Sequence, residues 1–241
     1  MTVERALLGA FRELGGDACR LVRVAEGSKF VLAEVEDPAG ERFGGLVSAR
    51  AGVTPRRWPA SAREAASLCA SPDPLAAAVG WATINAVINR PHLGASPADG
   101  VDWLLDAGRG RHVAFIGRFP FIEDEVRPEA ARLSIFELNP REGELGADAM
   151  PDVLPTADLI AVTATTILNR TLDQILGNRG VGSQVLLLGP STPLAPGLFD
   201  LGVSRLAGVV VRDLARVAAD VEAGVSFRSV GGTIRVSLAP G

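Results

Sequence analysis

The sequence has little of the chemistry that most metal and redox sites use. It contains two cysteines, two histidines, one lysine and no tyrosine among 241 residues. Cys19 and Cys69 stand 50 residues apart without a CxxC pair, so neither a disulfide framework nor a thiolate zinc site is indicated. His92 and His112 have no second histidine at ligand spacing, so we expect both to be structural. Because Lys29 is the single lysine, the phosphate-binding pattern GxxxxGK[ST] is absent as well.

Strong charge and long hydrophobic runs are also missing. The formal net charge is -4 and the isoelectric point is near 5.3, so the composition does not indicate the positive charge that would attract nucleic acid or an anionic membrane. No apolar run approaches the length of a membrane span, and the charged start MTVERALLGAF does not resemble a signal peptide. With 47% hydrophobic residues, the chain is typical of a globular protein of one large or two small domains. We expect a cytoplasmic protein without nucleic-acid or membrane partners.

The first part of the chain predicts a small α+β domain. Residues 4–14 carry a helical stripe of apolar residues that ends at two glycines. Three alternating segments follow, CRLVRVAEG, KFVLAEVED and FGGLVSA, and predict an antiparallel meander. A short helix over 61–69 and a long apolar helix from Ser71 to about Asn89, capped by Ser71, complete this part.

The pattern changes after NRPHLGASPADG at 89–100, a segment rich in Pro, Gly and Ser that we interpret as a domain boundary. Five apolar runs, HVAFIG, LSIFEL, DLIAVT, QVLLLG and GVVV, are typical of strands buried on both faces. Helical patterns lie at 99–107, 165–178 and 213–224. The fold class is therefore α/β, with a small α+β domain over 1–95 and a Rossmann-like parallel sheet, helices on both faces, over 96–241.

The carboxyl ends of the predicted strands mark the place for a ligand, because open parallel sheets bind ligands beyond that edge. These ends read GRFP at 117–120, ELNP at 137–140, TATTILN at 163–169, GPSTPL at 189–194 and VRD at 211–213. Most carry Gly, Pro, Asn or Thr in place of bulky side chains, so backbone N–H groups, hydroxyls and amides would face a ligand. GRFPF lacks the later glycines of GxGxxG, which argues against a dinucleotide.

Two of these ends leave alternatives open. Glu137 lies 20 residues after Gly117, where a nucleoside enzyme would hold ribose hydroxyls; otherwise it is a solvated acid at a strand end. Thr165 or Thr166 caps the helix that follows or, together with Asn169, holds an anion at the N-terminus of that helix.

Two further features also allow two readings. Asn85 lies inside an apolar helix and needs a hydrogen-bond partner, either in a neighbouring loop or across an interdomain cleft. The acidic run Glu123, Asp124 and Glu125 is either a hard-cation site or a solvated face. No Ser/His/Asp or Cys/His arrangement is present, so the residues nominate no nucleophile.

Five motifs carry a resemblance to a known family and together span nearly the whole chain. They are GWATINA at 80–86, GRFPF at 117–121, FELNP at 136–140, ADLIAVTATTILNRT at 157–171 and LLGPSTPLAPGLFDLGVSRLAGVVVRD at 187–213. The chain resembles proteins of unknown function that are associated with heavy-metal chelation, built from an enolase-N-terminal-like domain followed by a Rossmann-like domain. The resemblance implies a site in the interdomain cleft that binds or processes a metal-chelating small molecule or a metal complex.

The residues that the resemblance assigns to this site come from the strand ends and the apolar helix. The ligand-binding set is Asn85, Gly117, Arg118, Phe119, Asn139, Pro140, Thr165, Thr166, Asn169, Gly189, Pro190, Ser191 and Thr192. Glu137 and Asp213, the anionic side chains, are the candidates for catalysis and for metal contact. Since soft heavy metals prefer thiolate or imidazole, the set fits a chelated metal better than a bare ion.

Within this set, Arg118 would pair with the negative charge of the ligand, and the hydroxyls of the threonines and of Ser191 would donate hydrogen bonds. The alternative is an enzyme, a methyltransferase or reductase, that uses a nucleoside cofactor with Glu137 on its ribose. The implied cofactor is a metal ion or metal chelate. The sequence leaves open whether a reaction is catalysed and whether the chain forms a homo-oligomer.

Overall fold

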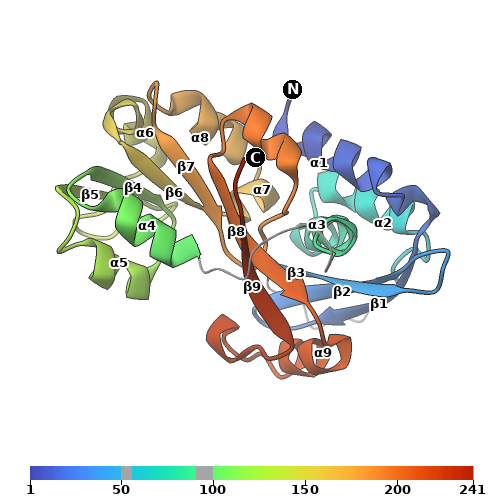
Figure 1. Ribbon diagram of the computed structural model, residues 1–241. Coiled ribbons are helices and arrows are strands. Elements are labelled where there is room, and N and C mark those ends of the chain that lie inside the picture. The colour runs from blue at the N-terminus through green and yellow to red at the C-terminus, as the bar shows by residue number, and fades with distance from the viewer. Residues whose placement is uncertain (50–55, 91–99, 241) are drawn as a thin grey trace.

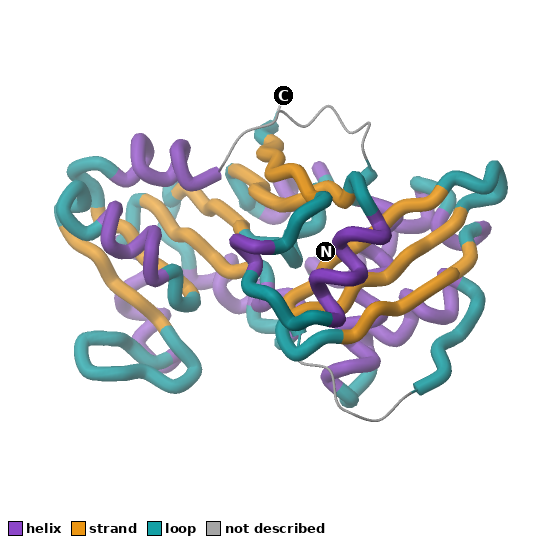
Figure 2. Tube along the Cα trace, turned by 90° about the horizontal axis from the view of Figure 1, so that it is seen from below, coloured by secondary structure: helices purple, strands orange, loops and turns teal. Residues whose placement is uncertain are grey.

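Two β-sheets and the helices packed on them make up the fold (Figure 1). The computed structural model describes residues 1–49, 56–90 and 100–240. An antiparallel sheet contains β1 (Arg20–Glu26), β2 (Phe30–Glu36) and β3 (Arg42–Ser48) in that order. A six-stranded sheet has the order β5-β4-β6-β7-β8-β9, and Figure 2 shows the two sheets side by side along the molecule. The predicted α/β class, with a small antiparallel sheet ahead of a mostly parallel one, is confirmed.

A long helix packs on one face of the antiparallel sheet. The helices of this part are α1 (Val3–Glu13), α2 (Ala62–Ser67) and α3 (Pro74–Ile88). Helix α3 lies against β2 and β3, and nearly all of its residues are buried, as its apolar sequence predicts. Its cap is Asp73 rather than the predicted Ser71: the Asp73 carboxylate accepts from Leu75 N (2.9 Å) and Ala76 N (3.3 Å). Pro74 at the first helical position leaves Asp73 as the residue just outside the helix.

The larger sheet has the predicted parallel strands and one strand that the sequence analysis missed. The parallel strands are β4 (His112–Ile116), β5 (Arg132–Phe136), β6 (Leu159–Thr163), β7 (Gln184–Leu188) and β8 (Arg205–Val211). The missed strand β9 (Thr233–Leu238) pairs antiparallel with β8. The helices are α4 (Gly100–Gly108), α5 (Pro120–Val126), α6 (Met150–Val153), α7 (Thr165–Leu168), α8 (Leu172–Asn178) and α9 (Leu214–Glu222). Short 3-10 turns are η1 (Gly16–Ala18), η2 (Leu68–Ala70), η3 (Ala147–Ala149), η4 (Leu154–Thr156), η5 (Pro196–Leu201) and η6 (Phe227–Ser229).

Helices cover both faces of this sheet, which is why its central parallel strands are mostly apolar. In β6, Ile160 packs into one core cluster together with Ile175 of α8, whereas Leu159 packs into another together with Leu104 of α4. Both side chains of β6 are completely buried. This continuous apolar pattern is the one that a parallel sheet covered on both faces requires.

The segment 165–178 departs from its predicted single helix. The helix is divided, because Arg170 adopts a left-handed conformation (φ 59°) between α7 and α8. Asn169 stabilises this break, since its Oδ1 accepts from Thr171 N (3.2 Å) and Thr171 Oγ1 (2.7 Å). The continuous helical prediction is therefore wrong at this point.

The acidic run at 123–125 belongs to a helix that the sequence analysis missed. This helix is α5, and Glu123 Oε1 accepts from Phe119 N (2.8 Å) at its start. The carboxylate of Glu123 thus satisfies a backbone N–H group at the helix N-terminus.

Helix α9, between β8 and β9, packs onto the first sheet. Val217 and Val221 of α9 form one buried cluster with Phe30 and Leu32 of β2 (Figure 1, red helix below the blue strands). The first sheet therefore lies between α3 and α9, a helix that connects β8 and β9 of the second sheet in sequence. The predicted domain boundary at 95/96 lies outside the described residues, and the division into two domains stays a prediction.

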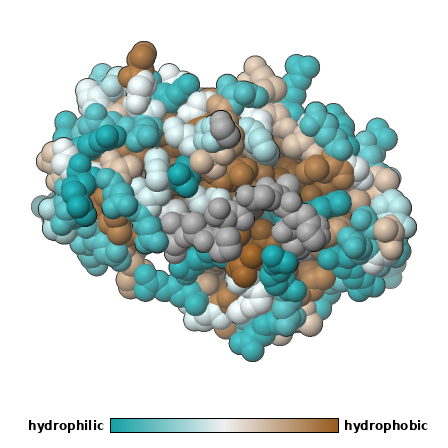
Figure 3. All heavy atoms as spheres, in the orientation of Figure 1, coloured by the Kyte–Doolittle hydropathy of each residue, from teal (hydrophilic) through white to brown (hydrophobic). Residues whose placement is uncertain are grey.

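The surface of this fold is mostly hydrophilic in the view of Figure 3, where hydrophobic residues gather toward the middle of the face. Within the described parts of the chain, no helix is both long enough and apolar enough to cross a membrane.

Candidate functional site

The candidate site lies where the chain changes direction in the larger sheet. From β4 the chain passes to β5 on one side and then to β6 on the other, so the switch point of the sheet is between β4 and β6. Gly117 follows β4 and Thr163 ends β6. A Cβ atom at Gly117 would lie 2.7 Å from Thr163 Cγ2, and the φ of this residue is 99°. Only glycine allows the two strand ends to approach so closely.

A pocket of about 250 Å³ opens at this point, and we call it the switch-point pocket. Its lining residues are Ile116, Gly117, Arg118, Phe136, Glu137, Leu138, Ala147, Met150, Thr163, Thr165, Thr166, Asn169, Thr171 and Gln174. Six of them were predicted from the sequence: Gly117, Arg118, Glu137, Thr165, Thr166 and Asn169. The structure therefore brings together predicted residues from three strand ends.

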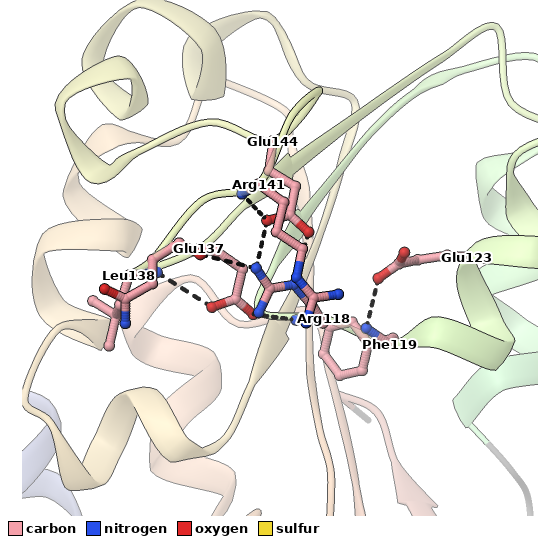
Figure 4. Close-up of polar contacts among 8 residues, drawn as sticks. Arg118, Phe119, Glu123, Glu137, Leu138, Arg141 and Glu144 are labelled. Atoms are coloured by element: carbon pink, nitrogen blue, oxygen red, sulfur yellow. Dashed lines mark hydrogen bonds and ion pairs between the residues drawn. The ribbon is translucent and has the colours of Figure 1, made fainter.

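Arg118 is held on one side of this pocket by two glutamates (Figure 4). Its guanidinium forms a two-pronged ion pair with Glu144, with Nε–Oε1 2.7 Å and Nη2–Oε2 2.6 Å. Nη2 also donates to Asn139 O (2.9 Å). The backbone N–H of Arg118 donates to Glu137 Oε1 (2.7 Å), and Leu138 N donates to Glu137 Oε2 (3.2 Å).

This network changes the expected role of Arg118. Its hydrogen bonds to Glu144 raise the pKa of Arg118, and those of Arg118 and of Arg141 N lower the pKa of Glu144 to about 2. The positive charge of Arg118 is thus balanced inside the protein, so the geometry gives no support to its predicted pairing with a ligand anion. The sequence analysis missed Glu144 because nothing in REGEL distinguishes it from a solvated loop acid.

Replacing Glu144 by glutamine should make the free energy of unfolding decrease less steeply as the pH is lowered below about 4.5. A glutamate with a lowered pKa stabilises the folded protein above its ordinary pKa of 4.5, and this contribution is lost as the pH falls toward about 2. The measurement is urea unfolding of both proteins at pH 7, 4 and 3. Glu142→Gln, two residues away on the exposed loop, is the control and should keep the wild-type profile. If the free energy of unfolding decreased by the same amount between pH 7 and pH 3 in the wild type and in Glu144→Gln, this would contradict the ion pair.

The threonines supply the hydroxyl groups of the pocket. Thr163 Oγ1 and Thr165 Oγ1 lie 3.1 Å apart, and both residues are partly exposed. Thr166 is buried, and its Oγ1 donates to Thr163 O (2.7 Å), which makes it a structural contact. Helix α7 has only four residues, so it lacks the aligned dipoles that the predicted anion site would need.

The donor set does not fit a bare heavy-metal ion. Glu137 is the only carboxylate among the described lining residues, and Met150 adds one thioether. In the described ranges no group of three or more His, Cys, Asp and Glu side chains could hold a metal. His112, predicted to be structural, has its ring nitrogens 3.0 Å from Thr156 O and from Ser134 Oγ. The pocket instead offers hydroxyls and amides, which are hydrogen-bonding groups.

Ser191 and Thr192 do not reach this pocket. Both are buried in the loop after β7, and Ser191 Oγ accepts from Ser48 N of β3 (2.8 Å). Asn85 Nδ2 donates to Ser191 O (3.0 Å), so the buried amide of α3 does cross to the second sheet, but it holds a loop. Ser191 Oγ and the backbone carbonyls of Ser191 and Thr192 thus connect the two parts of the molecule, and a ligand-binding role for these two residues has no support from the geometry.

The remaining predicted residues also lie elsewhere. Asp213 caps α9, where its Oδ1 accepts from Arg216 N (2.9 Å). Asn139, Pro140 and Pro190 are not among the described residues that line the pocket. Phe119 and Gly189 line a separate cleft, together with Arg118. Asp213 therefore contributes to the stability of a helix, and Glu137 is left as the acidic candidate of the site.

The switch-point pocket is not shared between the two predicted domains, because its described lining belongs entirely to the second. Another cavity, of about 240 Å³, does draw on both parts of the chain. Its lining residues are Thr2, Val3, Glu4, Trp81, Thr166, Ile167, Arg170, Leu172 and Asp173. Of the predicted site residues, Thr166 alone is among them.

Fold and site together define an α/β protein with a Rossmann-like sheet and a polar pocket at its switch point. The chain belongs to the DUF364 family, whose model, described as "Putative heavy-metal chelation", matches residues 99–239. The family predicted from the five motifs is thus confirmed.

Relatives with known sequences or structures agree with this assignment. An uncharacterized protein of Methanocaldococcus jannaschii is 28% identical over 142 residues, which cover 56% of this chain and 55% of the relative. The match thus spans about half the length of this curated relative. Two DUF364 proteins of unknown function have crystal structures that match all of this chain and all of their own. The TM-scores are 0.82 for the protein from Desulfitobacterium hafniense DCB-2 (24% identity) and 0.84 for that from Pyrococcus horikoshii (23%). At these identities the likeness shows the fold alone.

Proposed function

We propose that this protein binds a metal-chelating small molecule, or a metal complex of one, in the switch-point pocket. The family description supports a link to metal chelation. The position of the pocket supports ligand binding, because switch points of open α/β sheets form the crevices where ligands bind. The proposal concerns binding and assigns no reaction.

The observation that carries the proposal is the chemistry of the lining. Thr163, Thr165 and Asn169 present hydroxyl and amide groups, and Glu137 presents one carboxylate that two backbone amides already hold. Such groups recognise the oxygen and nitrogen atoms of an organic molecule by hydrogen bonds. Soft metal ions prefer thiolate or imidazole ligands, so the metal would be held by the chelator and the protein would hold the chelator.

The nucleoside-cofactor alternative has no specific observation in its favour. Both carboxylate oxygens of Glu137 accept hydrogen bonds from the backbone, which gives this residue a structural role at the strand end. The loop after β4 also has Gly117 as its single glycine, without the pattern that brings a pyrophosphate close to the backbone.

Replacing Thr165 by valine should weaken the binding of the small molecule about fivefold and so lower the amount that stays bound, because one hydrogen bond to a ligand contributes roughly 1 kcal/mol. The substitution keeps the shape of the side chain and removes only the hydroxyl. Native mass spectrometry of freshly purified protein, with elemental analysis of what stays bound, measures the occupancy and detects a metal in the same sample.

The matched control is Thr233→Val in β9, which removes a threonine hydroxyl outside the described pocket linings. It should retain the occupancy of the wild type. Equal occupancy in Thr165→Val, or a wild-type protein that carries no bound small molecule, would count against the proposal.

A further inference from the structure

A second, larger cleft is lined by residues of α4, α5 and the strands β7, β8 and β9. Its volume is about 540 Å³. The described lining is Gly100, Val101, Arg118, Phe119, Pro120, Phe121, Ile122, Leu188, Gly189, Ala207, Gly208, Ser226, Phe227, Arg228, Arg235 and Val236. We call it the aromatic cleft, because three phenylalanines form its walls. Apart from Arg118, it shares no described lining residue with the switch-point pocket.

The aromatic walls are held in place by the core beneath them. Phe119 packs edge-on against the buried Phe115, with ring centres 5.4 Å apart at 80°. Phe227 of η6 lies 6.2 Å from Phe30 of the first sheet. Phe121 in contrast is 58% exposed, an unusual position for a large apolar ring. Two fixed rings and one exposed ring therefore surround the cleft.

The charge of the cleft is of one sign. Arg118, Arg228 and Arg235 line it, and no acidic side chain is among its described lining residues. Glu144 balances the charge of Arg118. The guanidinium of Arg228 lies over the ring of Phe121 at 3.6 Å and makes no ion pair with a carboxylate in the described part of the chain. A positive charge is thus available at the rim, directly beside an aromatic surface.

A glycine in a left-handed conformation lines the cleft at the end of β7. Gly189 follows β7 with φ 118°, a conformation that L residues rarely adopt, and no other atom lies within 4 Å of the place where its Cβ would be. The first residue of the loop 189–194 is therefore uncrowded at the carboxyl edge of the sheet.

We propose that the aromatic cleft binds a planar aromatic anion, a ring system that carries a carboxylate, sulfonate or similar acidic group. The phenylalanines would contact the ring faces, and Arg228 would pair with the acidic group while remaining stacked on Phe121. The apolar walls strengthen that pairing, because they lower the dielectric around it. This inference goes beyond the function proposed for the switch-point pocket and does not depend on it.

The test uses 8-anilino-1-naphthalenesulfonate, a fluorescent aromatic anion, with the full-length folded protein. We expect saturable binding at one site with an increase in fluorescence. Arg228→Gln should weaken binding about fivefold through the loss of the charge-assisted contact. Phe121→Ala should weaken it about three- to tenfold through the loss of the ring contact. N-phenyl-1-naphthylamine, which has the same rings without the sulfonate, should bind more weakly than the sulfonate does.

Three further variants show whether binding occurs in this cleft. Arg63→Gln, on the exposed face of α2, removes an arginine charge far from the cleft and should leave binding unchanged. Thr165→Val should also leave it unchanged, so a failure of the first proposal would not affect this one. Circular dichroism checks that each variant is folded, and Phe121→Leu replaces Phe121→Ala if the latter is not. No saturable binding, equal affinity for the neutral analogue, or unchanged binding in Arg228→Gln would overturn the proposal.

Discussion

Replacing Asn89 by alanine should lower the free energy of unfolding by about 3–5 kcal/mol. The Asn89 side chain is buried at the end of α3. Its Nδ2 donates to Thr192 O (2.9 Å) and to Val209 O (3.2 Å), and its Oδ1 accepts from Leu194 N (2.8 Å). All three partners belong to the second half of the chain. Alanine would leave three buried backbone groups without this partner, and each such loss costs about 1–3 kcal/mol.

Urea unfolding followed by circular dichroism at pH 7 measures this effect. The control is Asn178→Ala at the end of α8, where the amide makes one surface hydrogen bond to Gln174 O (3.0 Å). We expect this control to cost less than about 0.5 kcal/mol. A similar loss in both variants would show that Asn89 does not connect α3 to the second sheet.

Replacing Gly45 by alanine should destabilise the protein by about 3 kcal/mol or more. Gly45 lies in β3 directly beneath α3. A Cβ atom there would collide with Ala82 O and Ala86 N and would lie 2.9 Å from the carbonyl carbon of Asn85. These are backbone atoms of a helix, so no side-chain rotation relieves the overlap. The helix would have to move away from the sheet, and the contacts that Asn85 makes with the loop after β7 would move with it.

Gly177→Ala in α8 is the matched control, because no other atom lies within 4 Å of the Cβ position and the residue is helical. We expect it to be neutral or to stabilise the protein by up to about 1 kcal/mol, since alanine is the better helix former. The thermal midpoint of Gly45→Ala should therefore fall, and that of Gly177→Ala should stay at the wild-type value or rise. A Gly45→Ala protein with the wild-type midpoint would contradict the close packing of α3 on β3.

Much of the fold is predictable from local patterns. The five apolar runs are all strands of the larger sheet, and the three alternating segments form the antiparallel sheet. Two elements escape prediction for reasons that lie in their residues. Strand β9 is partly exposed over Thr233–Arg235, so it lacks the continuous apolar run of its neighbours. Helix α5 is short, and three of its residues form the acidic run, which hides its helical pattern.

The position of the candidate site is also predictable from the sequence, but the state of its side chains is not. The rule that ligands bind at the carboxyl edge places Gly117, Glu137 and Thr165 together from their positions at strand ends alone. It does not reveal that Glu144 neutralises Arg118, because a loop of several residues separates Glu144 from the strand end. The break at Arg170, which shortens α7 to one turn, is equally hidden in a continuous helical pattern.

The sequence by itself determined the α/β class, the family and the edge of the sheet where a ligand would bind. The class and the edge follow from hydrophobic periodicity and from small or polar residues at strand ends, which are local in the chain, and the family follows from the resemblance of five motifs. Only the tertiary structure decided which polar groups remain available to a ligand. Ser191 Oγ, Ser191 O and Thr192 O accept hydrogen bonds from Ser48, Asn85 and Asn89. These donors lie about a hundred residues or more away in sequence. Hydrogen-bond partners of that kind are set by packing between distant elements, so no local pattern reports them.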